Sequence, residues 1–418
     1  MQRHRIQAVF LLILLIAGTV SFAQMNDRKR QESEVFNKRE KVTSNIKDTR
    51  WHWGPFSSTF EANLGQIGYD SNIFSSIDGE ELGDFVVSPR VGLKSFLRFS
   101  PHFIAKFHTQ GQYVWYKDLD HLRDWYPDNT VAFYSLFKRV YFELSYSSAK
   151  DRIRTNSELI ERNENRRTIF SFDSMLQISP RFFVNLSASE SEKEYTQKSE
   201  HFENNNSFFS KQTLTLTYQK HVRFWPFIEI GRMEAEFKNR VVPQVSESYT
   251  LFLGARNQKG RRWHYLVKMG QKNDDYEFQL GSASITREMD DWTYQLYSSY
   301  KVKRHISVEA GINQNAIYSY LDGYTHFLSQ RFLLGFHYRF KNDFELNPDL
   351  YVGTNKYQPL PEYESKSYDY QSINLNFKIP FGNNSKINYT VGYENREVIQ
   401  FSGSIKGWYT FIDLNYQL

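Results

Sequence analysis

Apolar and polar residues alternate in successive segments from about Phe56 to Leu418. A period of two residues is typical of a β-strand with one dry face and one wet face. In one such segment, the dry face carries Ile306, Val308, Ala310 and Ile312. The polar face recurs in nearly every segment, as expected for strands around a water-filled lumen. The pattern predicts about eighteen strands of this kind.

Short and long connections alternate between these segments. The short ones carry turn residues or charge, and they lie at 99–102, 137–140, 178–181, 219–222, 258–261, 302–305, 340–343 and 380–384. The long ones are polar and include 117–129, 150–167, 190–206 and 273–291. Alternation of this kind is typical of an up-and-down transmembrane barrel with both chain ends on the short-turn side.

The last segment runs to Leu418, so it can pair with the first strand and remove both sheet edges. We therefore predict an all-β chain that forms a closed antiparallel up-and-down transmembrane β-barrel of about 18 strands over residues 51–418. No segment of this region approaches the ~20 apolar residues of a membrane helix. The mean hydropathy of -0.62 does not count against a barrel, because alternate residues alone face lipid.

Residues 1–23 have the features of a secretory signal peptide. Arg3, His4 and Arg5 precede an apolar run from Ala8 to Ile16, and 21–23 supply small residues for cleavage. An uncleaved anchor is the alternative, but the run is short for a membrane span. The mature chain is expected to begin at Gln24.

Residues 24–50 differ from the barrel because they are highly charged. From 25 to 50 the chain holds eight Lys or Arg and five Asp or Glu. One interpretation is a disordered or frayed helical segment in the periplasm. The other is a plug that enters the pore, or a docking peptide for a periplasmic partner.

Composition supports a membrane barrel and excludes several functions. The chain has 28 Tyr, 35 Phe and 8 Trp, and many lie at strand ends, which predicts two aromatic girdles. The expected location is the outer membrane of a Gram-negative bacterium. The expected partners are the lipids of that membrane and its assembly machinery. The barrel region is formally neutral, so no nucleic-acid partner is expected. The chain has no cysteine, which excludes thiol chemistry and disulfides.

Candidate chemistry is confined to the lumen. We find no phosphate-binding loop, no metal-ligand spacing and no nucleophile–base set, so we expect no catalytic residue, no metal and no cofactor. Strand parity directs a cluster of cations inward: Arg90, Lys94, Arg98 and Lys106. This basic patch could concentrate anionic solutes or an acidic polysaccharide. The alternative is charge pairing that solvates and stiffens the wall.

A short string near the first strand carries a family resemblance. It consists of Gly68, Tyr69, Asp70, Ser71, Asn72, Ile73 and Phe74, and it is followed by Asp84 and the stretch 88–93. Over roughly 45 residues this stretch resembles the opening of the beta-barrel porin 2 family of outer-membrane proteins. Members of that family often accompany exopolysaccharide genes, so the resemblance implies polymer export with periplasmic export components. For 70–72 themselves, an Asx-type turn is the simpler expectation.

Three functions stay open from the sequence. The first is export of a polysaccharide through a passive or guided channel. The second is a general or sugar-selective porin. The third is a closed barrel whose extracellular loops bind surface ligands.

Overall fold

The computed structural model describes residues 34–73, 82–153, 163–195, 206–219, 223–237, 244–257, 262–280, 283–319, 324–359, 364–380, 385–398 and 403–417. The predicted signal peptide, residues 24–33 and Phe74 lie outside the described residues. The chain divides into two units, Met1–Glu34 and Val35–Leu418, and all of the described strands lie in the second.

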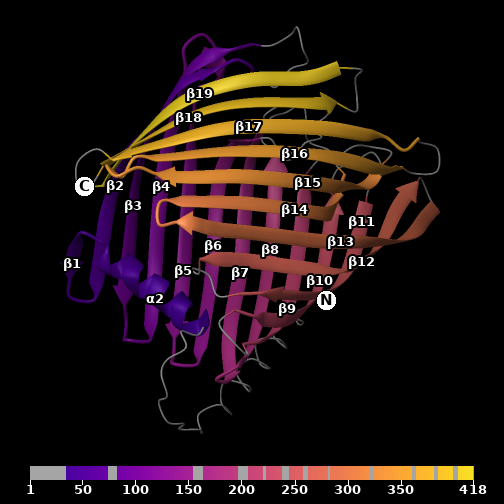
Figure 1. The fold of residues 1–418 in the computed structure, drawn as a ribbon, viewed down its shortest axis with the longest axis horizontal. Coiled ribbons are helices and arrows are strands. Elements are labelled where there is room, and N and C mark those ends of the chain that lie inside the picture. The colour runs from indigo at the N-terminus through magenta and orange to yellow at the C-terminus, as the bar shows by residue number, and fades with distance from the viewer. Residues whose placement is uncertain are drawn as a thin grey trace. The chain divides into compact units, whose positions relative to one another are not determined.

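Within the described residues, eighteen long strands form one closed antiparallel sheet (Figure 1). They are β2 (Phe56–Asp70), β3 (Asp84–Arg98), β4 (Phe103–Tyr116), β5 (Asp124–Leu136), β6 (Val140–Ile153), β7 (Asn163–Ser179), β8 (Phe182–Tyr195), β9 (Ser207–Tyr218), β10 (Trp225–Phe237), β11 (Gln244–Arg256), β12 (Trp263–Leu280), β13 (Ala283–Lys303), β14 (Ile306–Tyr318), β15 (Tyr324–Arg339), β16 (Glu345–Pro359), β17 (Ser367–Pro380), β18 (Ser385–Val398) and β19 (Gly403–Gln417).

Each strand pairs with the next in the chain, and β19 pairs with β2 from Tyr409 opposite Asp70 to Gln417 opposite Glu61. This closure leaves no unpaired edge between the first and last strands. The predicted fold class is confirmed. Three smaller elements complete the described part of the chain: helix α2 (Glu34–Lys47), strand β1 (Trp51–Trp53) and a short 3-10 helix η1 (Asp120–Leu122).

The strands have an apolar outer face and a more polar inner face. On β11, Leu251 and Leu253 are 54% and 61% exposed, whereas Ser246 and Ser248 on the other face are buried. Large exposed apolar side chains recur on the other strands around the barrel. A band of this kind is stable in contact with lipid and not in water.

Tryptophans mark both ends of this outer band. Trp263 lies at the short-turn end of β12, while Trp125, Trp292 and Trp408 lie toward the long connections, and all four are at least half exposed. Indole rings favour the headgroup level of a membrane, so their positions fit the two predicted girdles. Among the described helices, none is long and apolar enough to cross a membrane.

One expected loop is a hairpin. The polar stretch 273–291 continues β12 and β13, whose register pairs Leu280 with Ala283. Backbone ladder bonds hold these strands together, and the two faces are reversed there. Tyr276 and Met289 belong to an apolar cluster on the inner face, whereas Asp275 and Glu277 are exposed on the outer face. At the other end, the turn 340–344 places Asp343 at a φ of 63°, a left-handed conformation that Asp tolerates better than most residues.

Candidate functional site in the barrel lumen

The basic patch lies on the inner face of β3 and β4. Its residues alternate with the outward Val91 and Leu93, which are 46% and 41% exposed. The register places Lys106 opposite Phe96, with Lys94 opposite His108 on the adjoining inward position. Of the four residues, Arg90 lies farthest from the short turns. Its Nη2 donates to Gln112 Oε1 at 2.8 Å. Arg98 ends β3 at the short-turn rim.

Carboxylates of the neighbouring strands face this patch. Glu61 on β2, Asp128 on β5 and Glu143 on β6 all interact electrostatically with Lys106. The Tyr141 hydroxyl donates to Glu143 at 2.5 Å. The inner wall is therefore of mixed charge, with the cations on β3 and β4 and acids on each side. The role of the four cations in passage stays a prediction.

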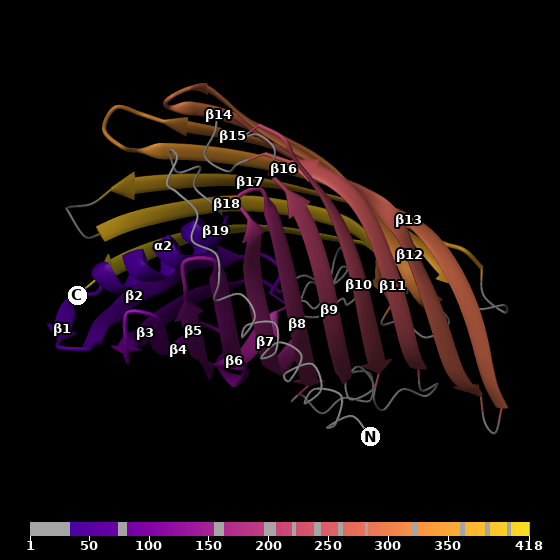
Figure 2. The same cartoon turned by 90° about the horizontal axis from the view of Figure 1, so that it is seen from below.

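Helix α2 packs against the same wall. Its apolar side chains Val35, Val42 and Ile46 follow one face at helical spacing, and each is at most 6% exposed. They join a cluster with the following buried residues of β3 to β8: Phe96, Ile104, Ala132, Tyr134, Leu136, Tyr141, Met175 and Phe183. Figure 2 shows α2 beside these first strands of the barrel.

These strand residues point inward and lie near the short turns. Phe96, for example, shares its face with Lys94, two residues away, while Val91 and Leu93 on the other face of β3 are exposed outside. Apolar side chains on a lumen wall would be poorly hydrated without a cover. The helix supplies that cover, so residues 35–47 occupy part of the lumen at its short-turn mouth.

Polar contacts fix the helix in register. Lys38 forms an ion pair with Asp173 of β7, and its Nζ lies 5.0 Å from the ring centroid of Tyr141. Burial lowers the pKa of the Arg39 guanidinium, which stays charged. The exposed side of α2 carries Glu40, Lys41 and Lys47, which add charge to the remaining opening.

A short tether joins α2 to the barrel. Thr49 Oγ1 donates to the Ile46 carbonyl at 2.6 Å and closes the helix end. The Arg50 amide then donates to Thr59 Oγ1 of β2 at 2.9 Å. Strand β1 follows and pairs with the start of β2. Residues 48–50 therefore anchor the helix at the rim, close to the first strand.

The resemblance string lies at the far end of β2, where it binds the last strand. Asp70 Oδ1 accepts the Asn72 amide at 3.0 Å, which is the expected Asx turn. Ser71 exchanges two hydrogen bonds with the backbone of Trp408, its amide at 3.0 Å and its hydroxyl at 2.9 Å. Asn72 Nδ2 donates to the Lys406 carbonyl at 3.0 Å.

Two further residues of this string lie at the seam, which is the junction between the first strand β2 and the last strand β19. A Cβ at Gly68 would lie 1.8 Å from the Thr410 carbonyl oxygen, so the close approach of β19 requires glycine. The Tyr69 ring lies 5.2 Å from the Trp408 ring on the outer surface. The string thus joins the first and last strands, and the contacts it makes are structural.

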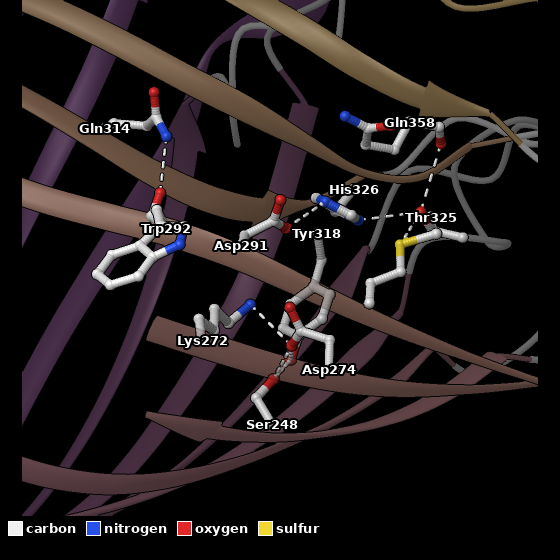
Figure 3. A network of polar contacts seen from close by, with 11 residues as sticks. Ser248, Lys272, Asp274, Asp291, Trp292, Gln314, Tyr318, Thr325, His326 and Gln358 are labelled. Atoms are coloured by element: carbon white, nitrogen blue, oxygen red, sulfur yellow. Dashed lines mark hydrogen bonds and ion pairs between the residues drawn. The ribbon is translucent and has the colours of Figure 1, made fainter. Parts of the chain in front are cut away.

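A buried polar network joins β11 to β15 at the opposite wall (Figure 3). The Ser248 hydroxyl contacts both Asp274 and the Tyr318 hydroxyl. Lys272 Nζ lies 2.9 Å from Asp274 Oδ1 and 4.5 Å from the Tyr318 ring centroid. Each of these side chains is at most 8% exposed.

The second half of this network centres on His326. Its Nε2 lies 2.7 Å from Asp291 Oδ2, and its Nδ1 lies 3.0 Å from Thr325 Oγ1. The Tyr276 ring stacks on the imidazole at 5.7 Å. Among the described residues, the hydroxyl of Ser248 contacts Asp274 and Tyr318, and neither of them is the histidine base of a serine nucleophile. The network cross-links strands far apart in the chain, and it was missed by sequence reasoning.

The described residues contain no group of three or more His, Asp or Glu placed to hold a metal ion.

Solved structures with a similar fold are outer-membrane proteins. The alcaligin outer membrane receptor FauA of Bordetella pertussis matches with a TM-score of 0.50 at 9% identity, over 88% of this chain and 77% of that one. The FrpB iron transporter of Neisseria meningitidis (F5-1 variant) matches at 0.51 and 10% identity, over 85% and 63%. The copper transporter OprC matches at 0.50 and 9% identity, over 82% and 61%.

The chain spans less than two thirds of FrpB and OprC. No protein-family model and no curated protein sequence matches it. The structural likeness establishes the fold alone, a closed β-barrel. A closed barrel with an exposed apolar band on its outer face lies in the outer membrane of a Gram-negative bacterium.

Proposed function

We propose that this chain is a conduit that guides a polysaccharide across the outer membrane, with no chemical step. The observation that carries a conduit is the polar inner face of the closed barrel, lined by charged side chains such as Lys94, Lys106 and Glu143. Eighteen strands enclose more space than wall side chains fill, so the remaining lumen holds water.

The choice of a polymer rests on the resemblance of 68–74 and 88–93 to the porin 2 family. A wall of mixed charge suits such a substrate because hydroxyl groups can exchange many weak hydrogen bonds along it. Passage needs contacts that are favourable enough for entry and weak enough for release. Periplasmic export components would deliver the chain end to the short-turn mouth.

Helix α2 belongs to this proposal because it narrows that mouth. A polymer entering there passes the exposed face of α2 and the basic patch in succession. The described contacts of the helix include three apolar side chains and one ion pair, and these lie on side chains rather than in the strand ladder. Displacement of the helix would therefore widen the opening without disturbing the ladder.

The test is efflux from proteoliposomes that contain the purified barrel. Vesicles are loaded with a fluorescent acidic polysaccharide, a neutral polysaccharide of equal length, or a labelled monosaccharide. We expect the acidic polymer to leave faster than the neutral one, and changing Arg90, Lys94, Arg98 and Lys106 to Gln should abolish the difference. A matched control changes the outward polar residue Thr109 to Gln.

Other outcomes point to other functions. If the monosaccharide leaves and neither polymer does, the chain is a porin for small solutes. If nothing leaves, even after α2 is displaced by Ile46→Asp, the pore is closed and the outer loops carry the function.

A further inference from the structure

We infer that the outer surface of β12 to β15, at its short-turn end, binds an anionic phospholipid of the adjoining leaflet. The inference concerns the lipid-facing side of the wall, so it stands whether or not the lumen conducts. Two independent features meet there: an apolar groove and a cluster of basic residues in the neighbouring turns.

The groove has a volume of about 480 Å³ and lies on the face that carries the exposed apolar side chains. Small residues form its floor, because Ala310 stands opposite Ser298 and Leu334 in the register. Larger apolar side chains form the walls: Trp263, Val267, Leu296, Ile312 and Phe332. At this depth hydrocarbon is the surrounding solvent, so an acyl chain is the natural occupant.

The groove opens toward cations at the headgroup level. Arg262 precedes Trp263, and its guanidinium lies 5.3 Å from the ring centroid of the outward Tyr300. Nε donates to the Lys301 carbonyl at 3.1 Å, and Nη2 donates to the Val302 carbonyl at 3.2 Å. These bonds use two of five donors and hold the charge on the outside of the barrel.

The next turn adds further charge beside Arg262. Lys303 and Arg304 are exposed at the end of β13 and the turn that follows it. The Trp263 indole is fixed along the wall, because Nε1 donates to Ser298 Oγ at 2.9 Å. A tryptophan at the interface with cations beyond it is the arrangement by which proteins meet phosphate headgroups.

The same sign of charge recurs at or beside the other described short turns, which carry Lys138, Arg139, Arg181, Arg223 and Lys341. The acid among these turns, Asp343, is paired with Arg339 at 2.9 Å. This basic collar attracts anionic headgroups generally. Among these basic turns, the one that carries Arg262 also has the apolar groove beside it, so it can bind the acyl chain as well as the headgroup of a lipid.

The experiment is native mass spectrometry of the intact barrel, released from detergent after mixing with phosphatidylglycerol or phosphatidylcholine. The triple change Arg262→Gln, Lys303→Gln and Arg304→Gln should lower phosphatidylglycerol retention about tenfold or more and bring it to the phosphatidylcholine level. The matched control, Lys138→Gln with Arg139→Gln, removes two collar charges away from the groove and should lower retention much less.

A second variant separates the groove from the charge. Ala310→Leu fills the floor, leaves every cation in place and faces lipid, so it should fold and still weaken retention of both lipids. Heat-modifiable migration of each variant checks folding. Equal losses in the triple variant and its control would overturn the site in favour of diffuse attraction. Unchanged retention in Ala310→Leu, or equal binding of glycerol phosphate without acyl chains, would overturn the role of the groove.

Discussion

Shortening two buried side chains of α2 should release the helix from the lumen wall. Val42 and Ile46 are 6% and 3% exposed, and they insert between apolar residues of β3 to β8. Changing both to Ala removes two carbons from valine and three from isoleucine. At about 0.8 kcal/mol for each buried CH₂ group, docking loses about 4 kcal/mol.

Part of that loss is offset in the helix itself. Alanine favours the helix by about 1 kcal/mol over the two β-branched residues together. A 14-residue segment is marginal as an isolated helix, so the released state is unfolded and this gain counts. The net change is about 3 kcal/mol against the docked state, which is roughly a hundredfold in the ratio of docked helix to released segment. A cavity left between these apolar side chains would add to the loss.

Labelling of a buried wall position measures this ratio. The chain has no cysteine, so Met175→Cys places a single thiol beneath α2. We expect a water-soluble maleimide to label it slowly in the otherwise native chain and roughly a hundredfold faster with Val42→Ala and Ile46→Ala. The control Ser44→Ala changes the exposed side of the helix and should leave the rate unaltered. Equal rates in all three proteins would refute the docking account.

Other predictions concern the seam, the patch and the topology. Gly68→Ala should slow barrel closure and reduce the heat-modifiable band on gels, because its Cβ would overlap the Thr410 carbonyl oxygen, whereas Gly111→Ala, with a nearest atom at 3.5 Å, should be tolerated. Changing the four residues of the basic patch to Gln should shift the reversal potential under a salt gradient toward cation selectivity. The expected change in permeability ratio is several-fold, since ~1.4 kcal/mol is tenfold. An unchanged reversal potential would mean that the patch has a structural role. An epitope inserted near Asn163 should be reached by antibody on intact cells and one at Asn383 should not, and the reverse result would invert the topology.

The sequence predicts the barrel because this fold depends on local signals that repeat in every strand. A period of two within each strand and short turns between them specify which face meets lipid and which strands pair. The extended hairpin of β12 and β13 escaped prediction, since 273–291 is rich in charge and its apolar side chains, such as Tyr276, face inward, opposite to those of the lipid-facing band. The seam string was read as an Asx turn, and its contact with Trp408 depends on closure between residues over 330 positions apart.

The sequence left the position of α2 open between a solvated segment, a plug in the pore and a docking peptide. Its three buried residues are spaced as in a helix, yet they stand in a segment whose charge equally suits a solvated one. Their partners are spread over β3 to β8, so the complementary surface exists only after the strands are aligned. A signal was present: inward positions such as Ile104 and Met175 are apolar near the short turns, where a wet wall would be polar. The polar network of Figure 3 was hidden for the same reason, because Ser248 and Tyr318 meet only in the closed sheet.

The most direct test of the central claim, a water-filled barrel with α2 seated in its short-turn mouth, is single-channel conductance in planar bilayers. The native chain should conduct at a low level, and Ile46→Asp, which places a charge in the apolar contact, should conduct through a wider opening. Ser44→Asp, on the exposed side, should behave as the native chain does. A barrel that folds and gives the same conductance in all three forms would contradict the account.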